Sequence, residues 1–441
     1  VDKTINNDVI GGTVVTSGYI KIQAVNTGSD TTLSKIIKLV EDATTSKAPI
    51  ARIADKVAGI FVPSVIAIAL LTTIIWIICK VEIGQAISFG IAVLVISCPC
   101  ALGLATPTAI MVGTGKAASY GILIKSATAL ETADKIKTVI LDKTGTITKG
   151  SPKVTDVIEF EESFLNIAYS LENNSEHPLA KAVVEYAKDK NIKLLNTTKF
   201  KSYTGSGISA EINSKLYYSG NYSFIESLGI KFDNNSILEL YNSGKTPLLF
   251  SDEQKVIGII AVADTIKETS KEAVEQLRAV NVDAVMLTGD NKQTANAVQK
   301  SAGIKTAYAQ VLPQQKEEII RNYKKKGITA MVGDGINDSP ALVTADVGIA
   351  IGAGTDIAID SADIVLMKSD LLDVVTLIEL SRSVLKNIKE NLFWTFIYNI
   401  LMIPVATGII PKVSMNPMIA CIAMILSSLT VTLNSLRLKK K

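Results

Sequence analysis

Three short polar sequences combine acidic, hydroxyl and glycine residues in a way that suits phosphoryl transfer. They are Asp-Lys-Thr-Gly-Thr at 142–146, Thr-Gly-Asp at 288–290 and Gly-Asp-Gly-Ile-Asn-Asp at 333–338. A carboxylate at the end of a buried strand can act as a nucleophile, while backbone N–H groups of the following turn face an incoming phosphate. We predict that Asp142 is this nucleophile.

Further side chains in and near these sequences complete a predicted active site. Thr288 can hydrogen-bond a phosphoryl oxygen, and Lys316 can neutralise the charge that develops during transfer. Asp334 and Asp338 can hold Mg²⁺ directly or through water. Any one of these residues alone is more often a solvated loop acid or a surface lysine, so the prediction depends on their combination.

A Cys-Pro-Cys sequence at 98–100 is a second candidate site, because it lies in the middle of an uncharged apolar run. Residues two apart on a regular helix point in different directions, but Pro99 removes a helical hydrogen bond and can open the turn. Both thiolates could then bind one ion. Thiolates favour Cu(I) and Zn(II) over hard cations such as Na⁺ or Ca²⁺.

The choice between Cu(I) and Zn(II) depends on charge. A divalent ion in hydrocarbon would gain from another carboxylate, yet the two apolar runs near the C-terminus contain no acidic or basic residue. They offer neutral donors instead, which suit a soft monovalent ion. These are Tyr398, Asn399, Met424, Ser427 and Ser428. Ordinary apolar filling by Met424 and close helix packing at the serines are the alternatives.

The elements that must position these residues include four long uncharged runs, 57–79, 83–115, 391–410 and 413–436. Each is long enough to cross ~30 Å of hydrocarbon at ~1.5 Å per residue, so we expect four membrane spans. Soluble helices of this length rarely lack a polar face. The runs pair as hairpins, and basic residues flank them on the side of the soluble blocks, which the positive-inside bias identifies as the cytoplasm.

Composition excludes several other classes of protein. Of the 441 residues, 48% are hydrophobic and 20% charged, so the chain is neither disordered nor collagen-like, and its length indicates more than one domain. The 45 basic and 42 acidic residues give a net charge of +3. No dense basic tract precedes the last three lysines, so we expect no nucleic-acid partner.

Between the membrane runs, buried-strand patterns alternate with helical patterns, which predicts a parallel, doubly wound sheet. Strands are expected at 138–141, 284–287 and 329–332, each followed by one of the three polar sequences. Ligands of such sheets bind at the carboxyl ends of the strands, so the three sequences should meet at one site. The segment 151–261 has its own strand and helix patterns and is interpreted as an inserted domain.

Residues 1–50 differ from the rest of the chain. Alternating residues at 13–16 and 19–25 predict short strands, and a helix should follow at 32–45. The segment is too short to make a convincing independent domain.

The three polar sequences resemble the signature set of the P-type ATPases, which are relatives of the haloacid dehalogenase-like phosphatases. The resemblance implies that ATP phosphorylates Asp142, with Mg²⁺ held by Asp142, the Thr144 carbonyl and Asp334. Those phosphatases carry a second Asp two residues after the nucleophile, where this chain has Thr144, so the acyl phosphate should persist. The catalytic residues implied are Asp142, Lys143, Thr144, Thr288, Gly289, Lys316, Asp334, Asn337 and Asp338.

The inserted segment resembles the adenine pocket of the heavy-metal branch of this family. A lone His beside Pro is more often a helix-start residue than a ligand. In the family, however, the Glu and His of Glu-His-Pro-Leu help orient the nucleotide base, and glycines let the backbone approach it. The nucleotide-binding residues implied are Glu176, His177, Gly205, Gly207, Ile208, Gly220, Asn221 and Asp290.

Cys-Pro-Cys, Tyr-Asn and Met-x-x-Ser-Ser together are similar to the pattern of Cu(I)-exporting members. The copper ligands implied are Cys98, Cys100, Tyr398, Asn399, Met424 and Ser428. Cys79 and Cys421 lie off this pattern, and we interpret them as packing residues. Silver is a chemically reasonable second substrate. The resemblance implies an integral protein of the bacterial plasma membrane, with lipid and ATP as partners and copper delivered by a cytosolic copper chaperone.

One motif of the family is missing. The actuator domain of P-type ATPases carries Thr-Gly-Glu, whose glutamate positions water to hydrolyse the aspartyl phosphate, and this chain contains no Thr-Gly-Glu. Residues 1–13 look like the segment just beyond that motif, so we expect the chain to begin within the actuator domain. It should form a phosphoenzyme slowly and fail to clear it.

We therefore predict a multidomain membrane protein: a transmembrane α-helical part, an α/β haloacid dehalogenase-like phosphorylation domain and an inserted α+β nucleotide-binding domain. The expected function is ATP-driven export of Cu(I) through an aspartyl phosphate. A Zn(II)/Cd(II) pump, a membrane-anchored phosphatase and a non-catalytic metal-binding remnant are the alternatives. The expected domains are 1–50 (actuator remnant and connecting helix), 51–117 and 383–441 (helix pairs), 118–150 with 262–382 (phosphorylation) and 151–261 (nucleotide binding).

Overall fold

The computed structural model describes residues 9, 19–24, 27, 32–46, 48–98, 100–175, 177–203, 206–230, 232, 235–290, 292–334, 338–352, 360–410 and 417–440. The predicted strand at 13–16 lies outside them, as do Pro99, Glu176, Gly205 and Asn337 and the side chain of Cys100. The chain divides into two compact units. One comprises 1–136, 363–367 and 376–441, and the other 137–362 and 368–375.

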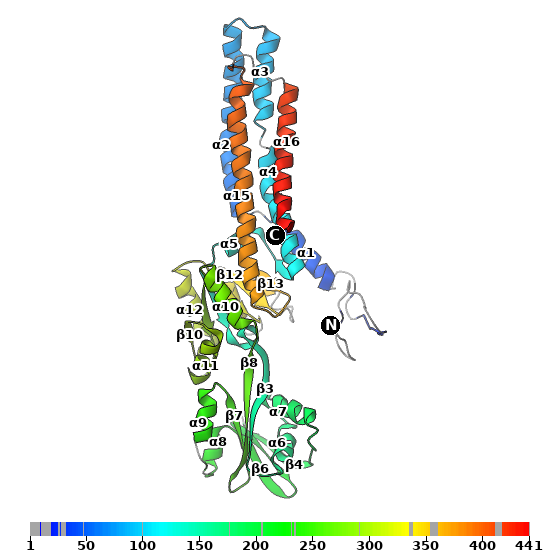
Figure 1. Ribbon diagram of the computed structural model, residues 1–441, viewed down its shortest axis with the longest axis vertical. Helices are drawn as coiled ribbons and strands as arrows, with labels where there is room; N and C mark the ends of the chain where they lie inside the picture. The colour runs from blue at the N-terminus through cyan, green and yellow to red at the C-terminus, as the bar shows by residue number, and fades with distance from the viewer. Residues whose placement is uncertain are drawn as a thin grey trace. The chain divides into compact units, whose positions relative to one another are not determined.

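Long helices dominate the first unit. They are α1 (Thr32–Thr45), α2 (Pro49–Ile78), α3 (Ile83–Ile96), α4 (Cys100–Tyr120), α5 (Ala127–Asp134), α15 (Leu372–Ala406), which starts in the other unit, and α16 (Pro417–Leu436). Helices α2, α3, α15 and α16 pack together and bury residues such as Ala69, Val93 and Ala420, while α4 continues the line of α3 and packs against α16 (Figure 1). The strands β1 (Ile122–Ile124) and β13 (Ile364–Leu366) pair antiparallel. The predicted helix at 32–45 is confirmed.

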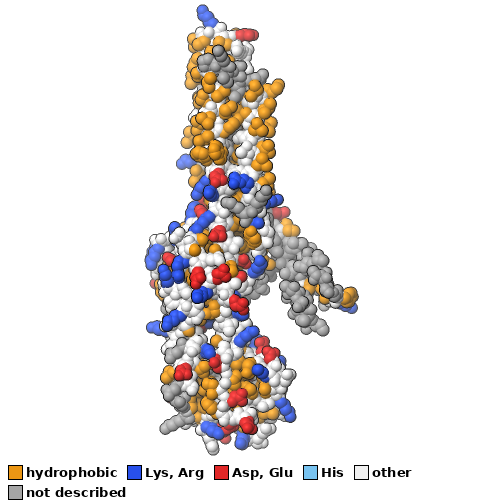
Figure 2. Space-filling model, in the orientation of Figure 1, with side chains coloured by type: hydrophobic (Ala, Val, Ile, Leu, Met, Phe, Trp, Pro, Cys, Tyr) orange, Lys and Arg blue, Asp and Glu red, His pale blue; other side chains and the backbone are white. Residues whose placement is uncertain are grey.

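Three helical stretches within the described residues are long and apolar enough to cross a membrane: Glu41–Ile78, Ile83–Tyr120 and Pro417–Lys439. Figure 2 shows hydrophobic side chains covering the outward faces of these helices. Exposed apolar surface of this extent is typical of contact with lipid.

Residues 391–406 of the expected fourth span, 391–410, form the second half of α15, which has 35 residues, and residues 407–410 follow the end of this helix. Trp394, Tyr398 and Asn399 make this half less apolar than the other three stretches. The number of four spans therefore stays a prediction.

The second apolar run is broken at the Cys-Pro-Cys sequence, as expected. Helix α3 ends at Ile96, and Ser97 has a ψ of 2°, whereas a helical residue has a ψ of roughly −42°. A new helix, α4, begins at Cys100. Cys98 consequently lies between the two helices and belongs to neither of them.

The second unit contains a parallel sheet. Its strands are β2 (Thr138–Asp142), β9 (Asp283–Leu287), β10 (Thr306–Tyr308), β11 (Thr329–Gly333) and β12 (Val347–Ile351). They lie in the order β12-β11-β2-β9-β10, and helices α10 (Ser270–Ala279), α11 (Lys292–Ala302), α12 (Pro313–Lys324) and α13 (Ser339–Thr344) lie between them in the chain. Strands β2 and β11 are buried throughout, as is typical of parallel strands covered on both faces. The three predicted strands are confirmed.

A second, antiparallel sheet forms the inserted region. Its strands are β3 (Thr148–Glu159), β4 (Thr197–Tyr203), β5 (Gly207–Ile212), β6 (Lys215–Gly220), β7 (Thr246–Ser251) and β8 (Val256–Ile266), in the order β3-β8-β7-β6-β5-β4. Helices α6 (Phe164–Glu172) and α7 (Pro178–Asp189) lie on one face, and α8 (Tyr222–Ser227) and α9 (Asn235–Asn242) on the other (Figure 1). The boundaries at 151 and 261 fall inside β3 and β8 and stay predictions.

The predicted strand at 19–25 is wrong for the residues that the structure describes. Residues 19–24 have no regular secondary structure, and Tyr19 and Ile22 are exposed. Alternation in sequence shows only that one face could be buried, whereas a strand also needs a neighbour that accepts its hydrogen bonds.

Candidate active site and membrane pocket

The carboxyl ends of three strands meet around Asp142. Strand β2 lies between β9 and β11, with Asp142 opposite Leu287 and Leu141 opposite Val332. Thr288 and Asp334, which follow the neighbouring strands, therefore come next to the end of β2. This register confirms that the three polar sequences form one site.

The turn after Asp142 is held in a fixed shape. A carboxylate oxygen of Asp142 accepts a hydrogen bond of 3.0 Å from the backbone N–H of Thr144. Gly145 has a φ of +73°, which favours glycine. A Cβ added at Gly145 would lie 3.8 Å from the Asp334 Cβ, so the turn packs against the loop after β11.

Lys316, from the first turn of α12, bridges two buried carboxylates. Its Nζ lies 2.6 Å from Asp142 Oδ1 and 2.6 Å from Asp338 Oδ1. Burial, and then the Asp338 charge, raises the pKa of Asp142 to about 6, while Lys316 and the Thr144 N–H offset part of this rise. Burial opposes the charged form of Lys316, but the two carboxylates outweigh it and raise the Lys316 pKa. At pH 7 the nucleophile is thus mostly ionised and paired with an ammonium group.

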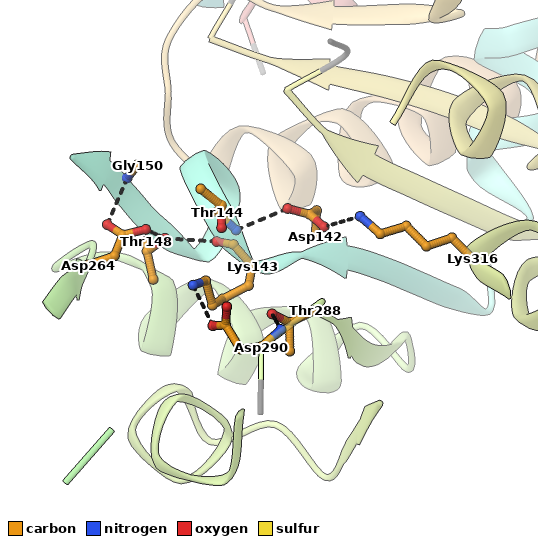
Figure 3. Close-up of polar contacts among 9 residues, drawn as sticks. All are labelled: Asp142, Lys143, Thr144, Thr148, Gly150, Asp264, Thr288, Asp290 and Lys316. Atoms are coloured by element: carbon orange, nitrogen blue, oxygen red, sulfur yellow. Dashed lines mark hydrogen bonds and ion pairs between the residues drawn. The ribbon is translucent and has the colours of Figure 1, made fainter. Parts of the chain in front are cut away.

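Two further loop residues pair on the other side of Asp142. Lys143 Nζ lies 2.6 Å from Asp290 Oδ2, and the backbone N–H of Asp290 donates to Thr288 Oγ1 at 3.1 Å. Figure 3 shows Lys316 reaching Asp142 from one side and the Lys143–Asp290 pair on the other. Asp290, which was predicted to bind nucleotide, therefore joins the turn after β2 to the loop after β9. Gly289, which lies between Thr288 and Asp290 in the chain, is exposed.

Sequence reasoning missed Asp264 and Lys267. The Asp264 carboxylate accepts hydrogen bonds from Thr148 Oγ1 and from the backbone N–H of Gly150 (Figure 3). Lys267 Nζ donates to the Gly145 carbonyl at 2.5 Å, and burial lowers the Lys267 pKa to about 8. The signal was present, because Asp264 ends a long apolar strand run in the same way as Asp142 does.

A small pocket in the helical unit collects most of the predicted metal ligands. Among the residues that the structure describes, seven line it, namely Cys98, Ala101, Thr395, Tyr398, Asn399, Met424 and Ser427. None of them is charged. The Tyr398 hydroxyl is buried and has no hydrogen-bond partner among the described residues. Ser427 lines the pocket in place of the predicted Ser428.

Known proteins resemble this chain along its whole length. A family model of haloacid dehalogenase-like hydrolases matches residues 136–346, and one of the P-type ATPase actuator domain matches residues 1–41. A crystal structure of a zinc-transporting PIB-type ATPase in the E2.Pi state is 33% identical, with a TM-score of 0.78, and the match covers 94% of this chain and 68% of that one. The chain belongs to the P-type ATPases.

Curated relatives of this P-type ATPase are named for copper. The copper-exporting P-type ATPase of Bacillus subtilis is 49% identical, and the match covers 100% of this chain and 56% of the relative. The probable copper-importing P-type ATPase A of Enterococcus hirae is also 49% identical, with 100% and 61% covered. The chain thus spans little more than half the length of the curated relatives it matches.

The acidic site of this P-type ATPase suits a hard cation. Asp142, Asp334 and Asp338 supply three carboxyl groups, and Lys316 pairs with those of Asp142 and Asp338. Within the described part of the chain, no three Asp, Glu, His or Cys side chains are grouped as a complete metal site. Mg²⁺ usually takes only one or two carboxylates and completes its shell with water and substrate phosphates. Asp142, Asp334 and the Thr144 carbonyl fit such a partial oxygen set.

The predicted nucleotide-binding residues also have structural partners within the insert. His177 caps α7, because its Nδ1 accepts from the Leu179 N–H at 3.2 Å. Gly207 and Gly220 are paired across β5 and β6, and a Cβ on either would lie within 2.6 Å of the Phe224 ring. Asn221 caps α8 by accepting from the Phe224 N–H at 2.8 Å, and Ile208 is buried in the core. Nucleotide binding by these residues stays a prediction.

Glu172 is a further acidic residue that sequence reasoning missed. It is 4% exposed at the end of α6, and its carboxylate accepts a hydrogen bond from Ser219, the neighbour of Gly220. Burial raises its pKa from an ordinary 4.5 to about 7, although the bond from Ser219 lowers it in part. Glu172 is therefore a buried acid that titrates near neutral pH beside the predicted nucleotide-binding strands.

We expect the stability of the insert to fall as pH rises from about 4.5 to about 7. In this window the folded state binds more protons at Glu172 than the unfolded state does, so the linkage slope is negative. The difference is on the order of 3 kcal/mol. Hydrogen exchange of the β5 and β6 amides, corrected for the intrinsic effect of pH, measures it. Glu172→Gln should remove this dependence, whereas Glu226→Gln, at an exposed acid of the same region, should keep it.

Proposed function

We propose that this chain is part of a P-type ATPase that exports Cu(I), using an aspartyl phosphate formed on Asp142. The observation that carries the proposal is the membrane pocket, which gathers the Cys98 sulfur, the Met424 thioether and the Tyr398 and Asn399 side chains without any charged residue. Soft sulfur donors in an uncharged pocket favour a soft monovalent ion over a hard or divalent one. We include Cys100 as the second thiolate and Ag(I) as a second substrate.

The phosphorylation step that we propose uses the residues around Asp142. A carboxylate oxygen of Asp142 attacks the γ-phosphorus of ATP, the bond to the bridging oxygen breaks, and ADP leaves. Lys316 and the Thr288 hydroxyl stabilise the charge on the transferred group, and the Thr144 N–H holds the carboxylate in line. Mg²⁺, when bound, would neutralise phosphate charge. Because Thr144 cannot act as a base, the acyl phosphate should outlive that of a phosphatase.

The remaining partners follow from the same proposal. Glu176, His177 and the glycines of β5 and β6 would hold the adenine base, with Glu172 as an additional polar group at the same strands. The apolar helices would sit in lipid, in a bacterial plasma membrane, because the relatives cited are bacterial proteins. A cytosolic copper chaperone would supply Cu(I).

A Zn(II) pump is the second candidate, since a similar solved structure is of a zinc-transporting PIB-type ATPase. Competition of the purified chain with chromophoric chelators, for Cu(I) and for Zn(II) separately, distinguishes the two. The proposal expects tight binding of Cu(I) and weak binding of Zn(II). The reverse order would overturn it. Phosphate release from small phosphoesters tests the phosphatase alternative, and we expect none.

Lys316→Gln should slow phosphoenzyme formation from ATP on the order of 100-fold. The change removes the ammonium group that bridges two carboxylates at 2.6 Å each, so it leaves uncompensated negative charge where a phosphate must approach. Rapid-quench labelling with radioactive ATP measures the rate. Lys324→Gln is the matched control, because Lys324 lies on the same helix but donates to the Thr344 carbonyl. An unchanged rate in Lys316→Gln would contradict the assigned role.

A further inference from the structure

A cluster of hydrogen-bonded side chains joins α15 to α16. The asparagine cluster, as we name it, consists of Asn387, Asn391, Asn434 and Ser435. Asn391 Nδ2 donates to Ser435 Oγ at 2.9 Å, and Asn434 Nδ2 donates to Asn391 Oδ1 at 2.9 Å. Asn387 Nδ2 donates to the Asn434 carbonyl at 3.0 Å. Three contacts therefore cross between the two helices.

Three members of the cluster, Asn387, Asn391 and Ser435, are buried, and Asn434 is partly buried. Asn391 is 2% exposed and Ser435 is fully buried. The Arg437 guanidinium, which can only donate, contacts Asn434 Oδ1 at 3.1 Å, so the Asn434 amide nitrogen must face Asn391. A buried amide that loses its partner is strongly disfavoured. Sliding one helix along the other would break several of these contacts at once.

The cluster and the membrane pocket share one register. Asn391 precedes Tyr398 by seven residues on α15, and Ser427 precedes Asn434 by seven residues on α16. The two helices run in opposite directions (Figure 1). The step from Asn391 to Tyr398 on α15 and the step from Asn434 to Ser427 on α16 therefore lead in the same direction, each by about 10 Å along the helix axis. The Asn391–Asn434 contact therefore places Tyr398 level with Ser427, and both line the pocket. Thr395, another lining residue, also donates to the Asn391 carbonyl at 2.8 Å.

We propose that the asparagine cluster positions the copper pocket, by locking α15 and α16 in the register that sets Tyr398 and Asn399 opposite Met424 and Ser427. The cluster itself does not touch the ion. The inference rests on the proposed function, since it assumes that the pocket binds Cu(I). A shift by one residue would rotate the facing side chains by roughly 100° and move them by about 1.5 Å.

Asn391→Leu, in the full chain purified in detergent, tests this role. We expect its Cu(I) affinity, measured by competition with a chromophoric Cu(I) chelator, to fall on the order of tenfold, because interhelical contacts in membranes contribute about that factor. Thr430→Val is the matched control, since Thr430 is an exposed residue of α16 whose hydroxyl donates within the helix to the Leu426 carbonyl. Its affinity should equal that of the unchanged chain.

Thermal stability, measured on the same samples, distinguishes a role of Asn391 in positioning the pocket from a role in stabilising the fold alone. A folded Asn391→Leu protein that binds Cu(I) as tightly as the unchanged chain overturns the inference, even if it melts earlier. If Asn391→Leu does not fold, Ser435→Ala decides, with a smaller loss of affinity expected and restoration by Ser435→Thr. The proposed function fails separately, if the unchanged chain binds no Cu(I) or if Cys98→Ser leaves binding intact.

Discussion

Asp142→Asn is expected to abolish the acid-stable phosphoenzyme that forms from ATP. The amide nitrogen and oxygen of Asn are poor nucleophiles, so no acyl phosphate can form. The fold should survive, because Asn keeps the shape of Asp142 and relieves its repulsion with Asp338. Incubation with γ-labelled ATP, acid quench and gel separation measure the label, which we expect to drop to background.

Asp346→Asn is the matched control for this loss. Asp346 lies at the opposite end of the same sheet, where it accepts from the Thr329 N–H at 2.9 Å and pairs with Lys324 at 3.3 Å. The amount of radioactive phosphate on Asp346→Asn should stay near that on the unchanged chain. Labelling that persists in Asp142→Asn and resists hydroxylamine would show that another residue accepts the phosphate.

Cys98→Ser is expected to reduce Cu(I) binding by at least about 100-fold, the largest effect among the pocket residues. Cys98 lies in the break between α3 and α4, and among the side chains that the structure describes, it and Met424 contribute the sulfur atoms that line the pocket. A serine hydroxyl is a hard donor that stays protonated, so it cannot replace a thiolate. Competition with a chromophoric Cu(I) chelator measures the loss.

Cys421→Ser is the matched control for the pocket. Cys421 lies on α16, within one turn of Met424 along the chain, but it does not line the pocket. Its replacement should leave Cu(I) affinity unchanged. Equal losses in the two variants would indicate a general effect of removing thiols, and no loss in Cys98→Ser would remove Cys98 from the site.

Local sequence determined the active-site strands and the broken helix. Asp142 could be found from the sequence because a buried apolar strand, an acid and a tight turn are consecutive, and the physics of each is local. The break at Cys98 followed from Pro99 for the same reason. The strand expected at 19–25 failed, since pairing depends on a neighbour that the pattern does not supply.

Other features depended on contacts between distant residues. The Lys316 bridge joins residues 174 positions apart, and the burial of Glu172 depends on packing of α6 against β6. Whether Ser427 or Ser428 lines the pocket depends on how far α16 is rotated about its axis. Burial and rotation are properties of the packed chain, so no spacing rule along the sequence can specify them.

Residue types and their spacing were enough to specify the kinds of chemistry in this P-type ATPase: a carboxylate at a strand end, soft donors in uncharged helices and an inserted domain with His and glycines. Packing between separate elements then set which side chains meet. It paired Lys316 with two carboxylates, Lys143 with Asp290, and Asn391 with Asn434. Residue type sets what a group can do, whereas distance and burial set its charge, its partner and its register, and these arise only when separate elements pack together.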